Sequence, residues 1–91
     1  MSEYLPSLDF SIRFIDDLLN NRFSAAERSA VKKALELLDQ NERHPSLQVH
    51  RLRGDEQGSW TCYVTAAIRI TFERLPDGHK RLLTLTRHYD R

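Results

Sequence analysis

The spacing of apolar residues changes once along the chain, near Leu47. Before this point apolar residues recur every three or four positions, as in helices that bury one side. After it apolar and polar residues alternate, as in strands with one buried face. This order predicts an α+β fold over residues 1–91 as a single domain, in which two helices cover one face of an antiparallel sheet of about four strands.

A short strand and a first helix are predicted near the start. Residues 8–10 form the strand, and Ser11 caps a helix that runs to about Asn21. The apolar positions at helical spacing are Ile12, Ile15, Leu18 and Leu19. One longer strand is the alternative, because apolar residues also alternate over residues 8–14. The acidic pair at residues 16–17 favours the helix.

The second predicted helix has a defined start and a defined apolar face. Ser24 and Glu27 match the Ser-x-x-Glu capping box, in which each residue satisfies a free amide of the first turn. The apolar positions that follow are Val31, Ala34, Leu35 and Leu38. Residues 41–45 end the helix.

The second half of the chain predicts four strands, at residues 49–53, 60–65, 68–73 and 81–86. A glycine-containing turn over residues 54–59 joins the first two, and the Pro76-Asp77-Gly78 sequence predicts a hairpin turn before the last. In the last strand Leu83 and Leu85 are the expected core pair. This parity leaves Thr84, Thr86 and His88 on the other face.

The polar face of the predicted sheet carries the candidate chemistry. Tyr63, Arg69 and Thr71 share the parity opposite to the apolar residues of their strands, and His88 and Arg87 follow the last strand. Arginine binds phosphate through a bidentate fork, and histidine exchanges a proton near neutral pH. These residues therefore predict a phosphodiester site, although each is also typical of a solvated strand surface.

The face occupied by His50 stays open. Simple alternation puts His50 on the side of Leu52 and turns Arg51 and Arg53 outward. A bulge or an irregular start of the strand would bring His50 to the polar face.

Charge and cysteine content narrow the classes of function. The net charge is only +1, but residues 1–44 carry a net −2 and residues 45–91 a net +3, which suits a phosphate-rich partner. The single cysteine, Cys62, excludes an internal disulfide and a Cys-rich zinc site, and the histidine spacing matches no usual metal site. No metal, cofactor or membrane partner is expected. A cytoplasmic location is expected, since no apolar stretch of membrane length and no signal-like start is present.

Several strings resemble the RelE/ParE superfamily of bacterial toxin–antitoxin toxins. They are His44-Pro45-Ser46-Leu47, His50-Arg51-Leu52-Arg53-Gly54, Gly58-Ser59-Trp60, Ile68-Arg69-Ile70-Thr71-Phe72 and Arg87-His88-Tyr89. The resemblance covers nearly the whole chain from Phe10. It implies a helical hairpin followed by a curved antiparallel sheet, whose concave face is the active surface.

The resemblance also implies roles for particular residues. Arg69 matches the strand arginine that contacts the scissile phosphate in RelE-type toxins, and His50 and His88 match two catalytic histidines of YafQ-type toxins. Tyr63 stands where YafQ-type toxins have a further histidine, and Thr61 and Tyr63 stand where RelE has two lysines. The residues expected to bind RNA are Arg51, Arg53, Arg87, Tyr89 and Arg91.

The leading hypothesis is a metal-independent endoribonuclease that cleaves mRNA, usually on the ribosome, and is blocked by a cognate antitoxin. His50 or Tyr63 would act as the base, Arg69 with Arg87 would stabilise the developing charge, and His88 would act as the acid. A ParE-like inhibitor of DNA gyrase without nuclease activity is the second hypothesis. A catalytically silent relative that binds an antitoxin is the third. The same fold suits all three.

Overall fold

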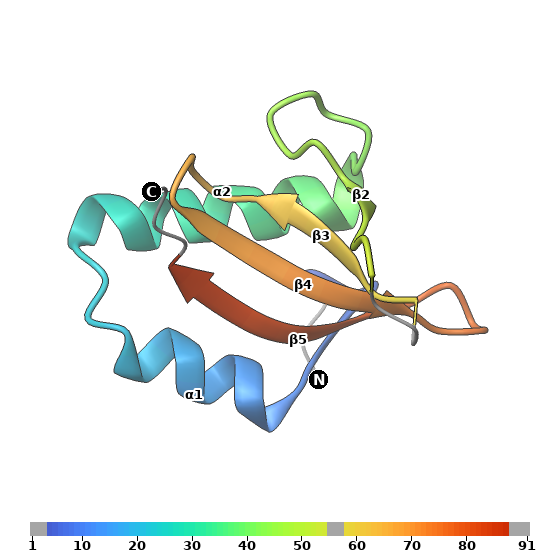
Figure 1. Cartoon of the computed structure of the whole chain (residues 1–91), viewed down its shortest axis with the longest axis horizontal. Coiled ribbons are helices and arrows are strands. Elements are labelled where there is room, and N and C mark those ends of the chain that lie inside the picture. Colours follow the sequence, from blue (N-terminus) through green and yellow to red (C-terminus); the bar gives the residue numbers. More distant parts are fainter. Residues whose placement is uncertain (1–3, 55–57, 88–91) are drawn as a thin grey trace.

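The computed structural model describes residues 4–54 and 58–87, which form two helices and a five-stranded sheet (Figure 1). The elements are β1 (Leu8–Phe10), α1 (Ile12–Asn20), α2 (Ala25–Gln40), β2 (His50–Arg51), β3 (Trp60–Tyr63), β4 (Ile68–Arg74) and β5 (Lys80–Arg87). The strand order across the sheet is β1-β5-β4-β3-β2. Strands β2 to β5 pair antiparallel, and β1 joins parallel to β5 as a fifth strand. The predicted α+β fold is confirmed.

Both helices begin at the predicted caps. The Ser11 hydroxyl accepts the Phe14 N–H at 3.0 Å and starts α1. At α2, the Ser24 hydroxyl accepts the Glu27 N–H at 3.1 Å, and the Glu27 carboxylate accepts the Ser24 N–H at 2.9 Å. This reciprocal pair is the predicted capping box. The predicted apolar face of α2 is confirmed, because Val31, Ala34, Leu35 and Leu38 are all buried.

The apolar positions of α1 are only partly buried. Its fully buried residue is Phe14, whereas Ile12 and Leu19 are 78% and 67% exposed. The longer strand over residues 8–14 is wrong, since the helix begins at Ile12. The reason for the exposure is the position of α1, which runs along β5 and turns only a narrow side to the core (Figure 1).

Polar side chains in the second half of α1 and at its C-cap bond to the part of the β5 edge that β1 leaves open. Strand β1 pairs only with Lys80 to Leu82. Beyond it, the Asp17 carboxylate accepts the Leu85 N–H at 2.9 Å, and the Asn21 amide donates to the Leu85 carbonyl at 3.2 Å. An uncovered strand edge invites pairing with another chain, so these bonds also guard against it.

The predicted core pair of the last strand is wrong by one residue. Thr71 pairs with Thr84, but Phe72 pairs with Leu82, so Leu83 is the extra residue of a β-bulge. The buried residues are therefore Leu82 and Leu85, both fully enclosed. Because the bulge precedes Thr84, the outward placement of Thr84 and Thr86 is unchanged.

The turns differ from prediction in extent rather than in kind. Strand β2 has only two residues, shorter than the predicted 49–53, because the chain turns after Arg51. The hairpin turn at residues 76–78 is confirmed: the Gly78 N–H donates to the Leu75 carbonyl at 3.0 Å, with a left-handed φ of 92° at Gly78. Among the described residues, no helix has the length and apolar character needed to cross a bilayer.

Candidate active site

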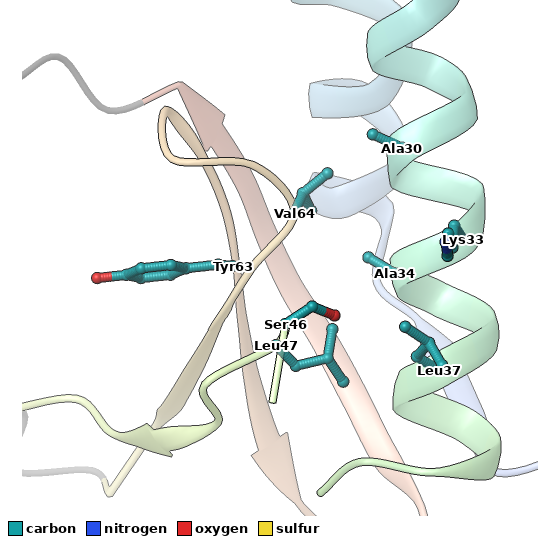
Figure 2. Close-up of a pocket in the computed structure, with 8 residues that line it drawn as sticks. All are labelled: Ala30, Lys33, Ala34, Leu37, Ser46, Leu47, Tyr63 and Val64. Atoms are coloured by element: carbon teal, nitrogen blue, oxygen red, sulfur yellow. The ribbon is translucent and has the colours of Figure 1, made fainter. Parts of the chain in front are cut away.

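The face of the sheet opposite the helices carries Tyr63 and Arg69 side by side. The two are cross-strand partners on β3 and β4, and Thr86 of β5 lies opposite Arg69. Ile68 and Ile70 on either side of Arg69 are fully buried, so alternation turns Arg69 to the outer face. Figure 2 shows the Tyr63 side chain pointing away from α2, while the neighbouring Val64 points toward it. The predicted outward placement of Tyr63 and Arg69 is confirmed.

Arg69 lies over the Tyr63 ring, and one of its donors has no partner among the described residues. Its guanidinium carbon is 4.6 Å from the ring centroid, which is a cation–π contact. The Arg69 Nε atom is closed off from solvent and has no hydrogen-bond partner within residues 4–54 and 58–87. A buried donor without a partner costs free energy, so such groups in native proteins call for an explanation such as a ligand. An anion is the ligand that a guanidinium binds most strongly.

The register of β2 settles the face of His50. His50 pairs with Thr61, and Arg51 pairs with Trp60. Directly opposite residues in an antiparallel pair share a face, so His50 lies on the face of Tyr63 and Arg69. The His50 and Tyr63 rings meet edge to face, with centroids 6.3 Å apart. The prediction that His50 lies on the side of Leu52 is wrong, because β2 ends at Arg51 and the alternation does not continue to Leu52.

The His50 ring is also tied to the loop before it. Its Nδ1 atom lies 2.6 Å from the Gln48 carbonyl oxygen. Gln48 has a left-handed backbone with φ of 47°, which is uncommon for a residue other than glycine. Sequence reasoning missed Gln48, since glutamine carries no signal for this conformation.

Two of the predicted RNA-binding arginines lie on the other side of the sheet. Arg51 extends over the Trp60 ring, 5.6 Å from its centroid, instead of facing outward as predicted. Arg87 lies opposite the buried Ile68, and its guanidinium donates to the Glu27 carboxylate at 2.6 and 3.1 Å. This pairing lowers the Glu27 pKa to about 2. The expectation that Arg87 assists Arg69 is therefore corrected, because alternation from Thr86 turns Arg87 toward the helices.

The remaining predicted site residues are accounted for as follows. Arg53 is exposed in the turn after β2. His88, Tyr89 and Arg91 lie outside the described residues, as do residues 55–57 of the predicted turn. Burial raises the pKa of the Cys62 thiol to about 12, so this group is no nucleophile. Within the described ranges, no group of three or more His, Cys, Asp or Glu side chains is placed to hold a metal ion.

A cleft borders this site on the helix side of the sheet. It has a volume of about 220 Å³ and lies between α2 and the β3 edge (Figure 2). Its walls are mostly apolar, with Ala30, Ala34 and Leu37 on α2 facing Leu47 and Val64. The catalytic candidates His50 and Arg69 do not line it. Tyr63 does line it, so the cleft and the polar face meet at this residue.

Several solved structures with a similar fold are bacterial toxins. The toxin of the Escherichia coli DinJ-YafQ toxin-antitoxin complex aligns with a TM-score of 0.69 and 20% identity, over 89% of this chain and 90% of that one. The YoeB dimer from Staphylococcus aureus aligns with a TM-score of 0.63 and 21% identity, over 91% of this chain and 97% of that one. The YoeB/ParE toxin from Agrobacterium tumefaciens aligns with a TM-score of 0.60 and 20% identity, over 91% of this chain and 99% of that one. No family model matches the sequence, and neither does any curated protein. The chain therefore has the fold of these YafQ and YoeB/ParE toxins.

Proposed function

We propose that this chain is the toxin of a toxin–antitoxin system and cleaves mRNA as a metal-independent endoribonuclease. The observation that carries the proposal is the Arg69 guanidinium on the open face of the sheet. It lies over the Tyr63 ring, which also contacts the His50 ring, and its buried Nε has no hydrogen-bond partner among the described residues. A guanidinium in this state fits a phosphodiester oxygen, and a neighbouring imidazole supplies proton transfer.

The reaction begins at the ribose. His50 takes the proton of the 2′-hydroxyl, and the 2′-oxygen attacks the adjacent phosphorus. Arg69 stabilises the charge that develops on the non-bridging oxygens. The bond from phosphorus to the 5′-oxygen breaks, and His88 gives that oxygen a proton. The products are a 2′,3′-cyclic phosphate and a 5′-hydroxyl. RNA is required because DNA lacks the attacking hydroxyl.

His50 suits the base better than Tyr63 does. The Tyr63 ring is occupied on one face by the Arg69 guanidinium and on its side by the His50 ring, so it supports both groups. A histidine base also works closer to neutral pH than a phenol, whose ordinary pKa is near 10. Tyr63 is therefore assigned to hold Arg69 in place.

The proposed partners are a cognate antitoxin and ribosome-bound mRNA. The YafQ toxin, which has the same fold, was solved in a toxin-antitoxin complex. An antitoxin that covers the polar face would exclude RNA from Arg69. The mRNA assignment rests on the phosphodiester chemistry of the site together with the resemblance of its residues to RelE- and YafQ-type toxins.

The test is an Arg69→Ala variant in induced bacterial cells. Wild-type protein should arrest growth and produce new mRNA ends within translated regions, detected by primer extension. Arg69→Ala should lower the cleavage rate by about 10²–10³-fold, the usual loss when one transition-state donor is removed. Its melting temperature should stay near that of the wild type, since the Arg69 Nε atom has no hydrogen-bond partner to lose in the described part of the chain. Lys32→Ala is the matched control, because Lys32 is an exposed cation on α2, on the helix side of the sheet.

Other results would redirect the assignment. Growth arrest with intact transcripts and altered plasmid supercoiling would replace the nuclease with a gyrase inhibitor. Full cleavage by a folded Arg69→Ala protein would remove Arg69 from the mechanism. The absence of both arrest and cleavage would leave a silent antitoxin-binding protein.

A further inference from the structure

The hydrogen bond between His50 and Gln48 determines where the imidazole carries its proton. A carbonyl oxygen only accepts hydrogen bonds, so the Nδ1 atom that lies 2.6 Å from the Gln48 oxygen must be the donor. In the neutral ring this leaves Nε2 unprotonated, with a lone pair. Within the described part of the chain, Nε2 has no hydrogen-bond partner. In a peptide in water the opposite tautomer, Nε2–H, is the more populated one.

The Gln48 carbonyl is held by an anchored loop. Leu47, just before it, is 1% exposed and belongs to the core. The Leu47 carbonyl accepts the Tyr63 N–H at 2.8 Å, and the Leu47 N–H donates to the His44 carbonyl at 3.1 Å. The left-handed φ of Gln48 then turns the chain so that its own carbonyl faces the His50 ring two residues later. The orientation is therefore set by the backbone and not by the glutamine side chain.

We propose that the backbone carbonyl of Gln48 is a positioning group that fixes His50 as the Nδ1–H tautomer, so that Nε2 is the atom that accepts the ribose proton. This assignment rests on the proposed nuclease function for its catalytic meaning. The tautomer itself does not depend on that function. Gln48 touches neither substrate nor reacting atoms and acts only through His50.

His44 provides an internal contrast in the same protein. Its Nδ1 accepts the Ser46 N–H at 3.2 Å, and the Ser46 hydroxyl lies 2.8 Å from the same atom. A backbone N–H only donates, so His44 must carry its proton on Nε2 when neutral. Two histidines six residues apart are thus held in opposite tautomers.

The first experiment measures these tautomers directly. Histidine labelled with ¹⁵N is recorded at a pH where the imidazoles are neutral, and His50→Gln and His44→Gln variants assign the signals. We expect His50 to show a protonated Nδ1 and an unprotonated Nε2, and His44 to show the reverse. A His50 signal dominated by Nε2–H would overturn the proposal, whatever the protein does to RNA.

The second experiment alters the backbone at Gln48. Gln48→Gly keeps the left-handed conformation accessible, so both the His50 signal and the cleavage rate should match the wild type. Gln48→Val disfavours that conformation because valine is β-branched. It should shift His50 toward Nε2–H and lower kcat on the order of 10-fold, less than the ~10⁴-fold seen when a catalytic histidine is locked in the wrong tautomer.

The two variants separate positioning from general structural damage. KM for the RNA should stay unchanged in Gln48→Val, and its His44 signal should still show Nε2–H. A loss of kcat with an unchanged His50 tautomer would overturn the positioning role. If wild-type protein shows the expected tautomers but cleaves no RNA, the proposed nuclease function is wrong. The assignment that the Gln48 carbonyl fixes the His50 tautomer then still holds.

Discussion

At the scale of single residues, the site depends on a stack in which an aromatic ring holds a cation. In the proposed site Arg69 binds the phosphate, and a long arginine side chain on an open sheet face would otherwise lose rotamer freedom on binding RNA. Contact with the Tyr63 ring restricts the guanidinium before the substrate arrives. The Nε atom of Arg69 is enclosed and has no hydrogen-bond partner within residues 4–54 and 58–87.

Substitutions of Tyr63 should therefore distinguish its ring from its hydroxyl. Tyr63→Phe keeps the ring and should cleave RNA at about the wild-type rate. Tyr63→Leu removes the cation–π contact, worth about 0.5–2 kcal/mol, and should lower cleavage roughly 2- to 30-fold. Single-turnover cleavage rates measure both. A large loss in Tyr63→Phe with an intact fold would instead make the hydroxyl the base, in place of His50.

At the scale of elements, α1 acts as the missing neighbour of β5. A helix has no free backbone groups along its sides, so the bonds to the β5 edge come from side chains that project from α1 and its caps. Asp17 and Asn21 serve the N–H and the carbonyl of the same residue, Leu85, as a paired strand would. This arrangement ties α1 to the sheet although Phe14 is its only fully buried residue.

Removing the Asp17 carboxylate should open this edge. Asp17→Ala leaves the Leu85 N–H without its acceptor and should lower the free energy of unfolding by about 1–3 kcal/mol. Asp16→Ala is the matched control, since Asp16 is exposed on the same helix and should change stability by less than about 0.5 kcal/mol. Urea unfolding measures both values. Equal stability of the two variants would show that water replaces the carboxylate at no cost.

At the scale of the whole molecule, ion pairs join segments that are distant in the sequence. Glu27 at the start of α2 holds Arg87 at the end of β5, and Asp9 of β1 holds His79 after the hairpin turn. The hydrogen bonds from Arg87 and the Ser24 N–H lower the Glu27 pKa to about 2. The hydrogen bond to Asp9 raises the His79 pKa above its ordinary value of 6.5.

These two shifts predict a stability optimum between weakly acidic and neutral pH. The contribution of Glu27 is present above pH 4.5 and is lost as the pH falls from there toward 2. The contribution of His79 is present below pH 6.5 and is lost as the pH rises through its raised pKa. Thermal melting against pH should show both limbs. Glu27→Gln should weaken the fall in melting temperature on the acidic side, and Asp9→Asn should weaken it on the alkaline side. A pH dependence that neither variant changes would contradict these assignments.

The amino-acid sequence by itself determined the elements whose signals are local. The capping box of Ser24 and Glu27, the buried face of α2, the alternation around Arg69 and the turn at residues 76–78 all depend on neighbours within a few positions. A capping box joins residues three positions apart, and side chains alternate along any regular strand. The sequence pattern was therefore enough to predict these features. The outward placement of Tyr63 and Arg69 followed from that alternation.

Only the tertiary structure decided the face of the sheet on which His50 lies and which leucines of β5 form its core pair. In a strand of two residues such as β2, the partner's register and not alternation sets the face, and His50 lies opposite Thr61. The extra residue of the bulge, Leu83, moves the residues before it in β5 to the opposite face from the one that alternation predicts. The buried pair is therefore Leu82 and Leu85. A side chain in a sheet alternates with period 2, and a shift of one residue therefore moves it to the opposite face. That shift is fixed by the pairing of each strand with its neighbour across a turn, which the pattern within a single strand does not record.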